Sequence, residues 1–182
     1  ITTNDEALAD RLRCLRNQGL GADAYTRHGA IVTRPLRYSE LGYNYRLTDL
    51  QAAVGLAQMD RLDGLVARRR ELAARYDAQL AAVDGVTAVA EPAWARHAYQ
   101  SYMILLDDGS RRDEVMTRMH ADGITTGRAV TAIHLEPLYG GAPGTAPVAE
   151  DVAQRGLILP LYPDLTEREL DRVVSSLADA LD

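Results

Sequence analysis

The sequence contains no lysine, because all twenty of its basic side chains are arginines. This absence excludes from the chain every chemistry that needs a lysine amine, including Schiff bases, amine nucleophiles and the lysine of a phosphate-binding P-loop. Phenylalanine is absent as well. Alanine, arginine, aspartate and leucine are abundant, as in proteins from GC-rich genomes, so base composition is the simplest explanation for the missing lysines.

Other scarcities narrow the class of protein further. The single cysteine, Cys14, excludes an internal disulfide and a metal site made of cysteines alone, which suits a cytoplasmic protein. The apolar runs are only a few residues long, so we expect no membrane-spanning helix. The net charge of −6 gives no overall attraction to a polyanion, and we expect no nucleic-acid partner. The chain begins at Ile1 without a signal-peptide pattern, as the interior of a longer protein would.

The first forty residues predict a helix followed by a long loop. Thr3-x-x-Glu6 resembles a capping box, and Gly19 is a plausible end for the helix that it begins. Residues 20–41 have no sustained period and predict a loop that contains an extended stretch at 31–33.

A second capping box, Thr48-x-x-Gln51, predicts the longest helix of the chain. Helical spacing of apolar residues continues from it through residue 80. One helix over 49–80 would be about 48 Å long, which is the length of a helix that bridges two lobes. Arg68–Arg70 lies within it, and we interpret this run as a solvated face rather than a nucleic-acid patch because no aromatic residues interleave with it.

From residue 81 the pattern alternates between strands and helices. The expected strands are 86–90, 99–106, 124–126 and 157–159. The expected helices are 110–123, 148–155 and a final amphipathic helix that Thr166 and Glu169 cap. This order predicts an α/β or α+β lobe built on a small sheet.

Two places in the sequence carry candidate binding residues. Tyr43-Asn44-Tyr45-Arg46 precedes a helix N-terminus, where an amide, a guanidinium and exposed N–H groups favour an anion. An ordinary turn with amphipathic tyrosines is the alternative there. His134 follows an expected strand, where substrate-facing residues often gather, and a structural histidine is the alternative. The residues alone leave both alternatives open.

The segment Gly42–Gln58, which reads GYNYRLTDLQAAVGLAQ, is similar to the signature of the DegT/DnrJ/EryC/StrS family of pyridoxal-phosphate (PLP) sugar aminotransferases. Further matches to the family follow in the correct order along nearly the whole chain: Thr2–Gly19, Arg68–Arg69, Ala74–Tyr76, Tyr99–Tyr102, Gly123–Thr126, Ile133–Tyr139, Pro147–Glu150 and Leu157–Tyr162.

The resemblance implies an α/β fold, namely the C-terminal part of an aspartate-aminotransferase-like protein of PLP fold type I. The expected architecture is a long bridging helix plus a small α/β sandwich lobe. It divides the chain into 1–47, the end of the large PLP domain with an active-site and dimer loop, 48–80, the interdomain helix, and 81–182, the C-terminal small domain.

The resemblance also implies roles for five side chains. Asn44 would reach the PLP phosphate of the neighbouring subunit in a homodimer. Tyr38, Tyr43 and Arg46 would line the sugar-nucleotide or phosphate region, and His134 would approach the substrate. The implied reaction moves an amino group from glutamate or glutamine to a keto-sugar, above all a nucleotide-linked 4-keto-6-deoxy sugar, with PLP as the electron sink.

In the family's order, the Schiff-base lysine, the aspartate that pairs with the pyridine nitrogen and the ring-stacking residues all precede Ile1. The resemblance therefore implies no catalytic residue in this chain, and we predict that its 182 residues alone are inactive. His28, His97 and His120 have no metal-like spacing with each other or with carboxylates, so we expect no metal ligand. Three alternatives stay open: a dehydratase-like member in which histidine replaces the lysine, a cyclitol-specific member, and a non-catalytic interaction or regulatory module that docks through its long helix.

Overall fold

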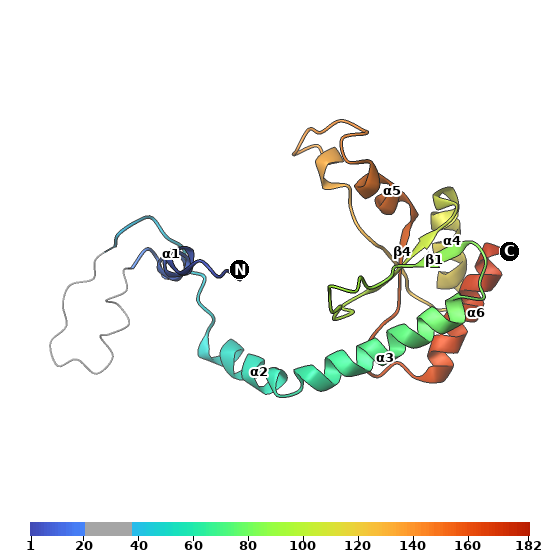
Figure 1. Ribbon diagram of the computed structural model, residues 1–182, viewed down its shortest axis with the longest axis horizontal. Helices are drawn as coiled ribbons and strands as arrows, with labels where there is room; N and C mark the ends of the chain where they lie inside the picture. Colours follow the sequence, from blue (N-terminus) through green and yellow to red (C-terminus); the bar gives the residue numbers. More distant parts are fainter. Residues whose placement is uncertain (21–37) are drawn as a thin grey trace. The chain divides into compact units, whose positions relative to one another are not determined.

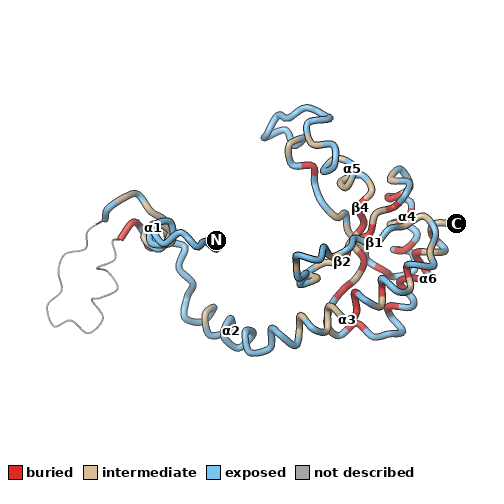
Figure 2. The backbone as a smooth tube through the Cα atoms, in the orientation of Figure 1, coloured by how far each residue is buried: buried red, intermediate tan, exposed pale blue. Residues whose placement is uncertain are grey.

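The computed structural model describes residues 1–20 and 38–182, which form two compact units, Ile1–Asp60 and Arg61–Asp182 (Figure 1). Unit 1 holds helices α1 (Glu6–Arg16) and α2 (Asp49–Met59). Unit 2 holds α3 (Leu62–Leu80), a small sheet and the remaining helices, and the buried residues gather there (Figure 2). The loop predicted over 20–41, with its extended stretch at 31–33, lies mostly outside the described residues.

Helix α1 begins differently from the prediction. Its N-cap is Asp5, whose carboxylate accepts a hydrogen bond from the Leu8 N–H at 3.0 Å. Thr3 instead accepts from the N–H of Asp5 through its hydroxyl oxygen, so the capping box predicted for Thr3 and Glu6 is wrong. A carboxylate both caps the free N–H groups and favours the positive end of the helix dipole, which explains why Asp5 takes this position.

The helix predicted over 49–80 forms as two helices, so that prediction was also wrong. Asp60 and Arg61 lie in a turn between α2 and α3, although the Asp60 N–H still donates to the Leu56 carbonyl at 3.4 Å. A negative charge at the C-terminal end of α2 opposes the helix dipole, whereas Asp63 in the first turn of α3 agrees with it. The capping box of Thr48 and Gln51 at the start of α2 is confirmed.

The sheet of unit 2 has the strand order β1-β2-β4-β3, and every neighbouring pair is antiparallel. The strands are β1 (Val86–Ala88), β2 (Tyr102–Leu106), β3 (Gly127–Arg128) and β4 (Gly156–Leu159). Ile104 in β2 lies opposite Ala88 on one side and Leu157 on the other. Residues along β2 alternate between buried and half-buried, so one face of the strand turns into the core.

The strand predicted at 124–126 does not form; the third strand lies three residues further on. Ile124 is buried for another reason, because it belongs to a Schellman cap at the end of α4 (Arg112–Ala121). Gly123, at φ +77°, donates to the His120 carbonyl, and Ile124 donates to the Met119 carbonyl at 2.9 Å. The apolar residue that suggested a strand thus closes the end of a helix.

Unit 2 is completed by α5 (Pro147–Arg155), α6 (Glu167–Leu181) and two 3₁₀ turns, η2 (Gly109–Arg111) and η3 (Ile133–Leu135). The capping box of Thr166 and Glu169 is confirmed at the start of α6. The largest fully buried side chains come from α3, β2, α4, β4, α6 and the turn before α6: Tyr76, Leu72, Ile104, Leu106, Val115, Met119, Leu157, Leu159, Leu165, Leu170 and Leu177. Among the described residues, no helix is both long and apolar enough to cross a bilayer.

The arginine run of α3 is not a solvated face, because all three guanidinium groups bind oxygens of unit 2. Arg68 donates to the carbonyls of Pro163 and Leu165 at 3.2 and 3.0 Å. Arg69 donates to the carbonyls of Tyr99, Gln100 and Leu161, and Arg70 to the carbonyl of His97 and the carboxylate of Glu91. Each guanidinium thus ties loops of unit 2 to α3, a role that a count of charges in the sequence does not reveal.

Candidate functional site

The segment that carries Asn44 is docked onto the C-terminal end of α1. The last carbonyls of a helix have no partner within the helix. Here the Leu15 carbonyl accepts from the Tyr43 N–H at 2.7 Å, and the Arg16 carbonyl accepts from the Tyr45 N–H at 2.9 Å. The Tyr43 carbonyl in turn accepts from the Gln18 N–H at 2.8 Å. The backbone on both sides of Asn44 is therefore held by the helix end.

Two glycines make this docking sterically possible. A Cβ atom at Gly42 would lie 2.1 Å from the Gly19 nitrogen and 2.8 Å from the Leu15 carbonyl oxygen. A Cβ atom at Gly19 would lie 1.8 Å from the Glu40 carbonyl oxygen, and Gly19 also has φ +79°, a conformation that favours glycine. Backbone meets backbone at both places, so no side chain can turn aside to make room.

The Asn44 side chain is exposed and contacts Arg46. The Arg46 Nε donates to Asn44 Oδ1 at 3.4 Å, and a guanidinium has only donors. The amide oxygen therefore faces Arg46, and the amide N–H groups make no hydrogen bond with another residue that the structure describes. The first turn of α2 begins directly after this segment, with Thr48 as its N-cap. An amide, a guanidinium and a helix N-terminus within six residues suit a phosphate or another anion.

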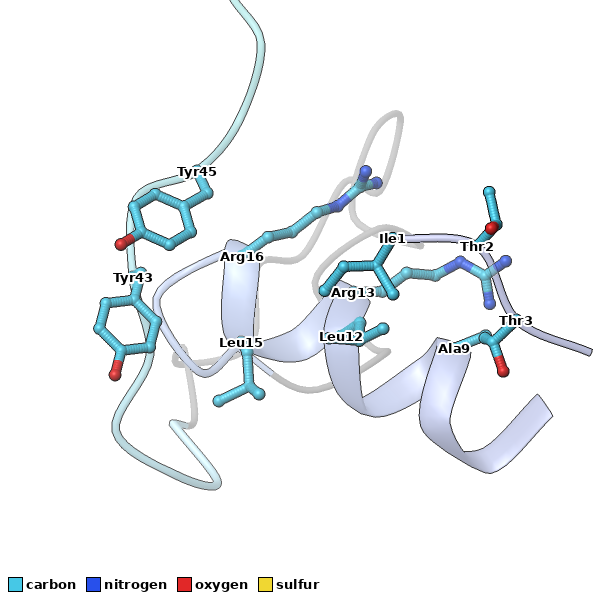
Figure 3. A pocket seen from close by; sticks show the side chains of 10 residues that line it. All are labelled: Ile1, Thr2, Thr3, Ala9, Leu12, Arg13, Leu15, Arg16, Tyr43 and Tyr45. Carbon is cyan, nitrogen blue, oxygen red and sulfur yellow. The ribbon is translucent and has the colours of Figure 1, made fainter. Parts of the chain in front are cut away.

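Tyr43 and Tyr45 form a parallel stack with ring centroids 5.1 Å apart. Both rings border a cavity of about 650 Å³ beside α1 (Figure 3). Leu12 and Leu15 provide its apolar wall, and the other lining residues are Ile1, Thr2, Thr3, Ala9, Arg13 and Arg16. Sequence reasoning left Tyr45 without a role, but its ring stacks on that of Tyr43. The spacing of the two residues at i and i+2 in an extended segment could have indicated this contact.

Tyr38 lies apart from this cavity. Its backbone forms an isolated antiparallel bridge with Leu20, and its side chain is 58% exposed. It does not line the cavity beside Tyr43. The structure brings Tyr43, Asn44 and Arg46 together on one segment, whereas Tyr38 lies outside that segment, at an isolated bridge.

His134 belongs to unit 2 and lies in the 3₁₀ turn η3. Its Nε2 is 2.8 Å from the Glu150 Oε1, and both side chains are largely covered. Glu150 also accepts from the N–H groups of Gly144 and Ala146, and the pKa of its carboxyl is lowered, first by the Gly144 N–H and next by His134. Sequence reasoning did not assign Glu150 a role, although an acidic residue in the first turn of a helix that begins with proline was a usable signal.

The sequence matches the model of the DegT/DnrJ/EryC1/StrS aminotransferase family over residues 1–178, so the chain belongs to that family. This match confirms the resemblance found in the sequence. Family membership relates the chain to proteins that are aminotransferases.

Solved structures of similar fold agree with this. The aminotransferase TlmJ from Streptoalloteichus hindustanus is 30% identical with a TM-score of 0.83, over 98% of this chain and 46% of that one. The sugar aminotransferase CalS13 from Micromonospora echinospora is 30% identical with a TM-score of 0.80, over 96% and 45%. A putative sugar aminotransferase from Streptococcus pneumoniae, Spr1654 in its PLP-form, shares the fold at 20% identity with a TM-score of 0.82, over 98% and 44%.

The chain spans less than half the length of each of these proteins. The expected α/β fold, the C-terminal part of an aspartate-aminotransferase-like protein, is confirmed by these likenesses. One part of that expected architecture is wrong, because the structure has two helices, α2 and α3, in place of a single bridging helix.

Proposed function

We propose that the chain is the C-terminal portion of a PLP-dependent aminotransferase that moves an amino group from glutamate or glutamine to a keto-sugar. The substrate that we propose is a nucleotide-linked 4-keto-6-deoxy sugar. The observation that carries the proposal is the family match over residues 1–178. The presence of a PLP-form among the proteins of similar fold supports the choice of cofactor.

The described residues fit the phosphate of PLP but not its aldehyde. Asn44 presents amide donors away from Arg46, in a segment that glycines 19 and 42 hold against α1. The chain has no lysine to bind the aldehyde covalently, so that group belongs to residues outside these 182. When bound, PLP supplies an electron sink for amino-group transfer. In our proposal Asn44 donates to the phosphate held in the neighbouring subunit.

The other predicted site residues have binding roles in this proposal. Arg46 adds a positive charge beside Asn44, so it attracts a phosphate or a nucleotide diphosphate. Tyr43 and Tyr38 offer exposed phenol rings to the sugar-nucleotide. His134 approaches the substrate from unit 2.

We propose that 1–47 ends the large domain, that α2 and α3 replace the single interdomain helix, and that 81–182 is the small domain.

We also propose that the protein is a cytoplasmic homodimer. No residue of α2 is buried, and its Leu50, Val54 and Leu56 are 82%, 64% and 70% exposed. A helix with so much exposed apolar surface gains stability from a partner, and the proposed partner is a second copy. Leu56→Glu should then shift the full-length protein toward monomer in sedimentation, whereas Gln58→Glu, with the same added charge on the same helix, should not. An unchanged dimer in Leu56→Glu contradicts this use of α2.

The function is tested with the full-length protein that contains this chain. A panel of keto-sugar nucleotides and keto-cyclitols, assayed with glutamate and with glutamine, should give amino transfer to a keto-sugar nucleotide. A lost hydrogen bond to a charged group costs about 1.5–3 kcal/mol, so Asn44→Ala should weaken PLP binding by about 10- to 100-fold. Asn4→Ala, the same change at an exposed position before α1, should leave it unchanged. Equal PLP affinity in both variants would show that Asn44 does not bind the phosphate.

A further inference from the structure

His134 and Glu150 form a contact that also fixes the loop between them. Gly141 donates its N–H to the His134 carbonyl at 2.8 Å, and a Cβ at Gly141 would lie 2.4 Å from that oxygen. The Glu150 carboxylate accepts from the Gly144 N–H at 2.8 and 3.0 Å and from the Ala146 N–H at 3.3 Å. The residues from 141 to 146 are thus attached to the backbone of His134 at one end and to its imidazole through Glu150 at the other.

The donors around Glu150 determine its charge. Backbone N–H groups can only donate, so two of them directed at one carboxylate stabilise its ionised form. The lowered pKa of the Glu150 carboxyl follows from these contacts, with the Gly144 N–H as the largest cause. An ionised carboxylate can only accept hydrogen bonds, so the contact of 2.8 Å requires that the imidazole Nε2 carries a proton.

We propose that Glu150 is a positioning residue that holds His134 as the Nε2–H tautomer and leaves Nδ1 as the nitrogen that accepts a hydrogen bond or proton from the ligand. This inference rests on the proposed function only for the identity of that ligand. In the described part of the chain, Nδ1 makes no hydrogen bond with another residue. A carboxylate that fixes one ring nitrogen and so assigns the opposite nitrogen to the ligand is the arrangement found around histidines that bind metals or move protons.

The tautomer is measured by nitrogen-15 NMR of histidine in the 182-residue chain, with no cofactor or activity needed. The chain has four histidines, and His134→Asn identifies the signal of His134 by its loss. At a pH where the imidazole is neutral, the expected spectrum shows a protonated Nε2 and an unprotonated Nδ1. A protonated Nδ1 at the signal assigned to His134 in the wild-type chain overturns the proposal.

Variants test the role of Glu150 itself. Glutamine at this position can donate as well as accept, so Glu150→Gln should replace the single tautomer by a mixture, seen as a shift of both ring nitrogens toward each other. Glu136→Gln removes the same charge from an exposed side chain two residues from His134, and it should leave the nitrogen signals unchanged. Unchanged signals in Glu150→Gln, in a chain whose core methyl signals match those of the wild type, refute the positioning role.

The outcomes separate this inference from the proposed function. If the full-length protein transfers no amino group but His134 has the Nε2–H tautomer, the function fails and the assignment of Glu150 stands. If amino transfer occurs and the tautomer is the opposite one, the function stands and Glu150 has only a structural role in the loop.

Discussion

Replacement of Gly42 by alanine tests whether the end of α1 holds the Asn44 segment. The new Cβ would meet the Gly19 nitrogen at 2.1 Å, the Gln18 carbonyl carbon at 2.5 Å and the Leu15 oxygen at 2.8 Å. All three are backbone atoms of the helix end, so the segment must move away. The φ of Gly42 is not positive, which means that alanine is unfavourable here for its contacts and not for its backbone angles.

The size of the effect follows from the bonds that the segment makes. Separation from α1 breaks three backbone hydrogen bonds, which join Tyr43 to Leu15 and Gln18, and Tyr45 to Arg16. At about 1 kcal/mol each, their loss removes about 3 kcal/mol of local stability. Every 1.4 kcal/mol is a factor of about ten, so the Tyr43 and Tyr45 amides should exchange with solvent about 100-fold faster.

Amide hydrogen exchange followed by NMR measures this directly. The Ala9 N–H serves as an internal reference, because it donates to the Asp5 carbonyl at the start of α1, at the opposite end of the helix from Gly42. Gly55→Ala is the matched control, since no atom lies within 4 Å of the Cβ that it adds in α2. In a helix this control should gain about 1 kcal/mol from alanine's higher propensity. Tyr43 and Tyr45 amides that exchange equally fast in both variants would refute the docking argument.

Three further predictions concern unit 2. Leu177→Ala removes a fully buried side chain of α6 and should lower the free energy of unfolding by about 2–5 kcal/mol in urea titrations. Burial raises the phenol pKa of Tyr76 and Tyr102 above 10.0, so ultraviolet absorbance should show that these two rings ionise later than an ordinary tyrosine or only on unfolding. The carboxyl pKa of Glu150 is lowered, so its hydrogen bonds to the loop are fully present above about pH 4.5 and are lost as the pH falls through the lowered pKa. The amide chemical shift of Gly144 should therefore show a transition with a midpoint below pH 4.5, and Glu150→Gln should abolish this transition.

Much of the fold follows from local sequence signals. The capping boxes of Thr48 and Thr166 predicted the starts of α2 and α6, because a hydroxyl at the N-cap and a carboxyl or amide three residues later satisfy each other's free groups. Gly123 predicted the end of α4 for a similar reason, since its positive φ suits a helix end. Signals of this kind depend on neighbours in sequence, so one sequence is enough to recognise them.

The parts that could not be predicted depend on residues far apart in sequence. The Arg68–Arg70 run looked solvated because its carbonyl partners lie 27 to 97 positions away. The sequence left an ordinary turn open as an alternative for the Asn44 segment, because the carbonyls that hold it belong to α1. The contact between Glu150 and His134 was not predictable for the same reason, since the two residues are 16 positions apart. The residue types of the candidate site were readable from the sequence, whereas the groups that orient them were not.

The two parts of the candidate site have different physical support, and this difference can be measured. Among the described residues of unit 1, only Asn17, Gly19 and Leu20 are buried, so backbone hydrogen bonds carry most of the hold on Asn44. Unit 2, which carries His134, has an apolar core that we expect to unfold cooperatively. Gly42→Ala should therefore open the Asn44 segment without a change in the unfolding of unit 2. Leu177→Ala should weaken unit 2 and leave exchange at Tyr43 unchanged. If either variant altered both properties, local hydrogen bonding could not be the main support of Asn44.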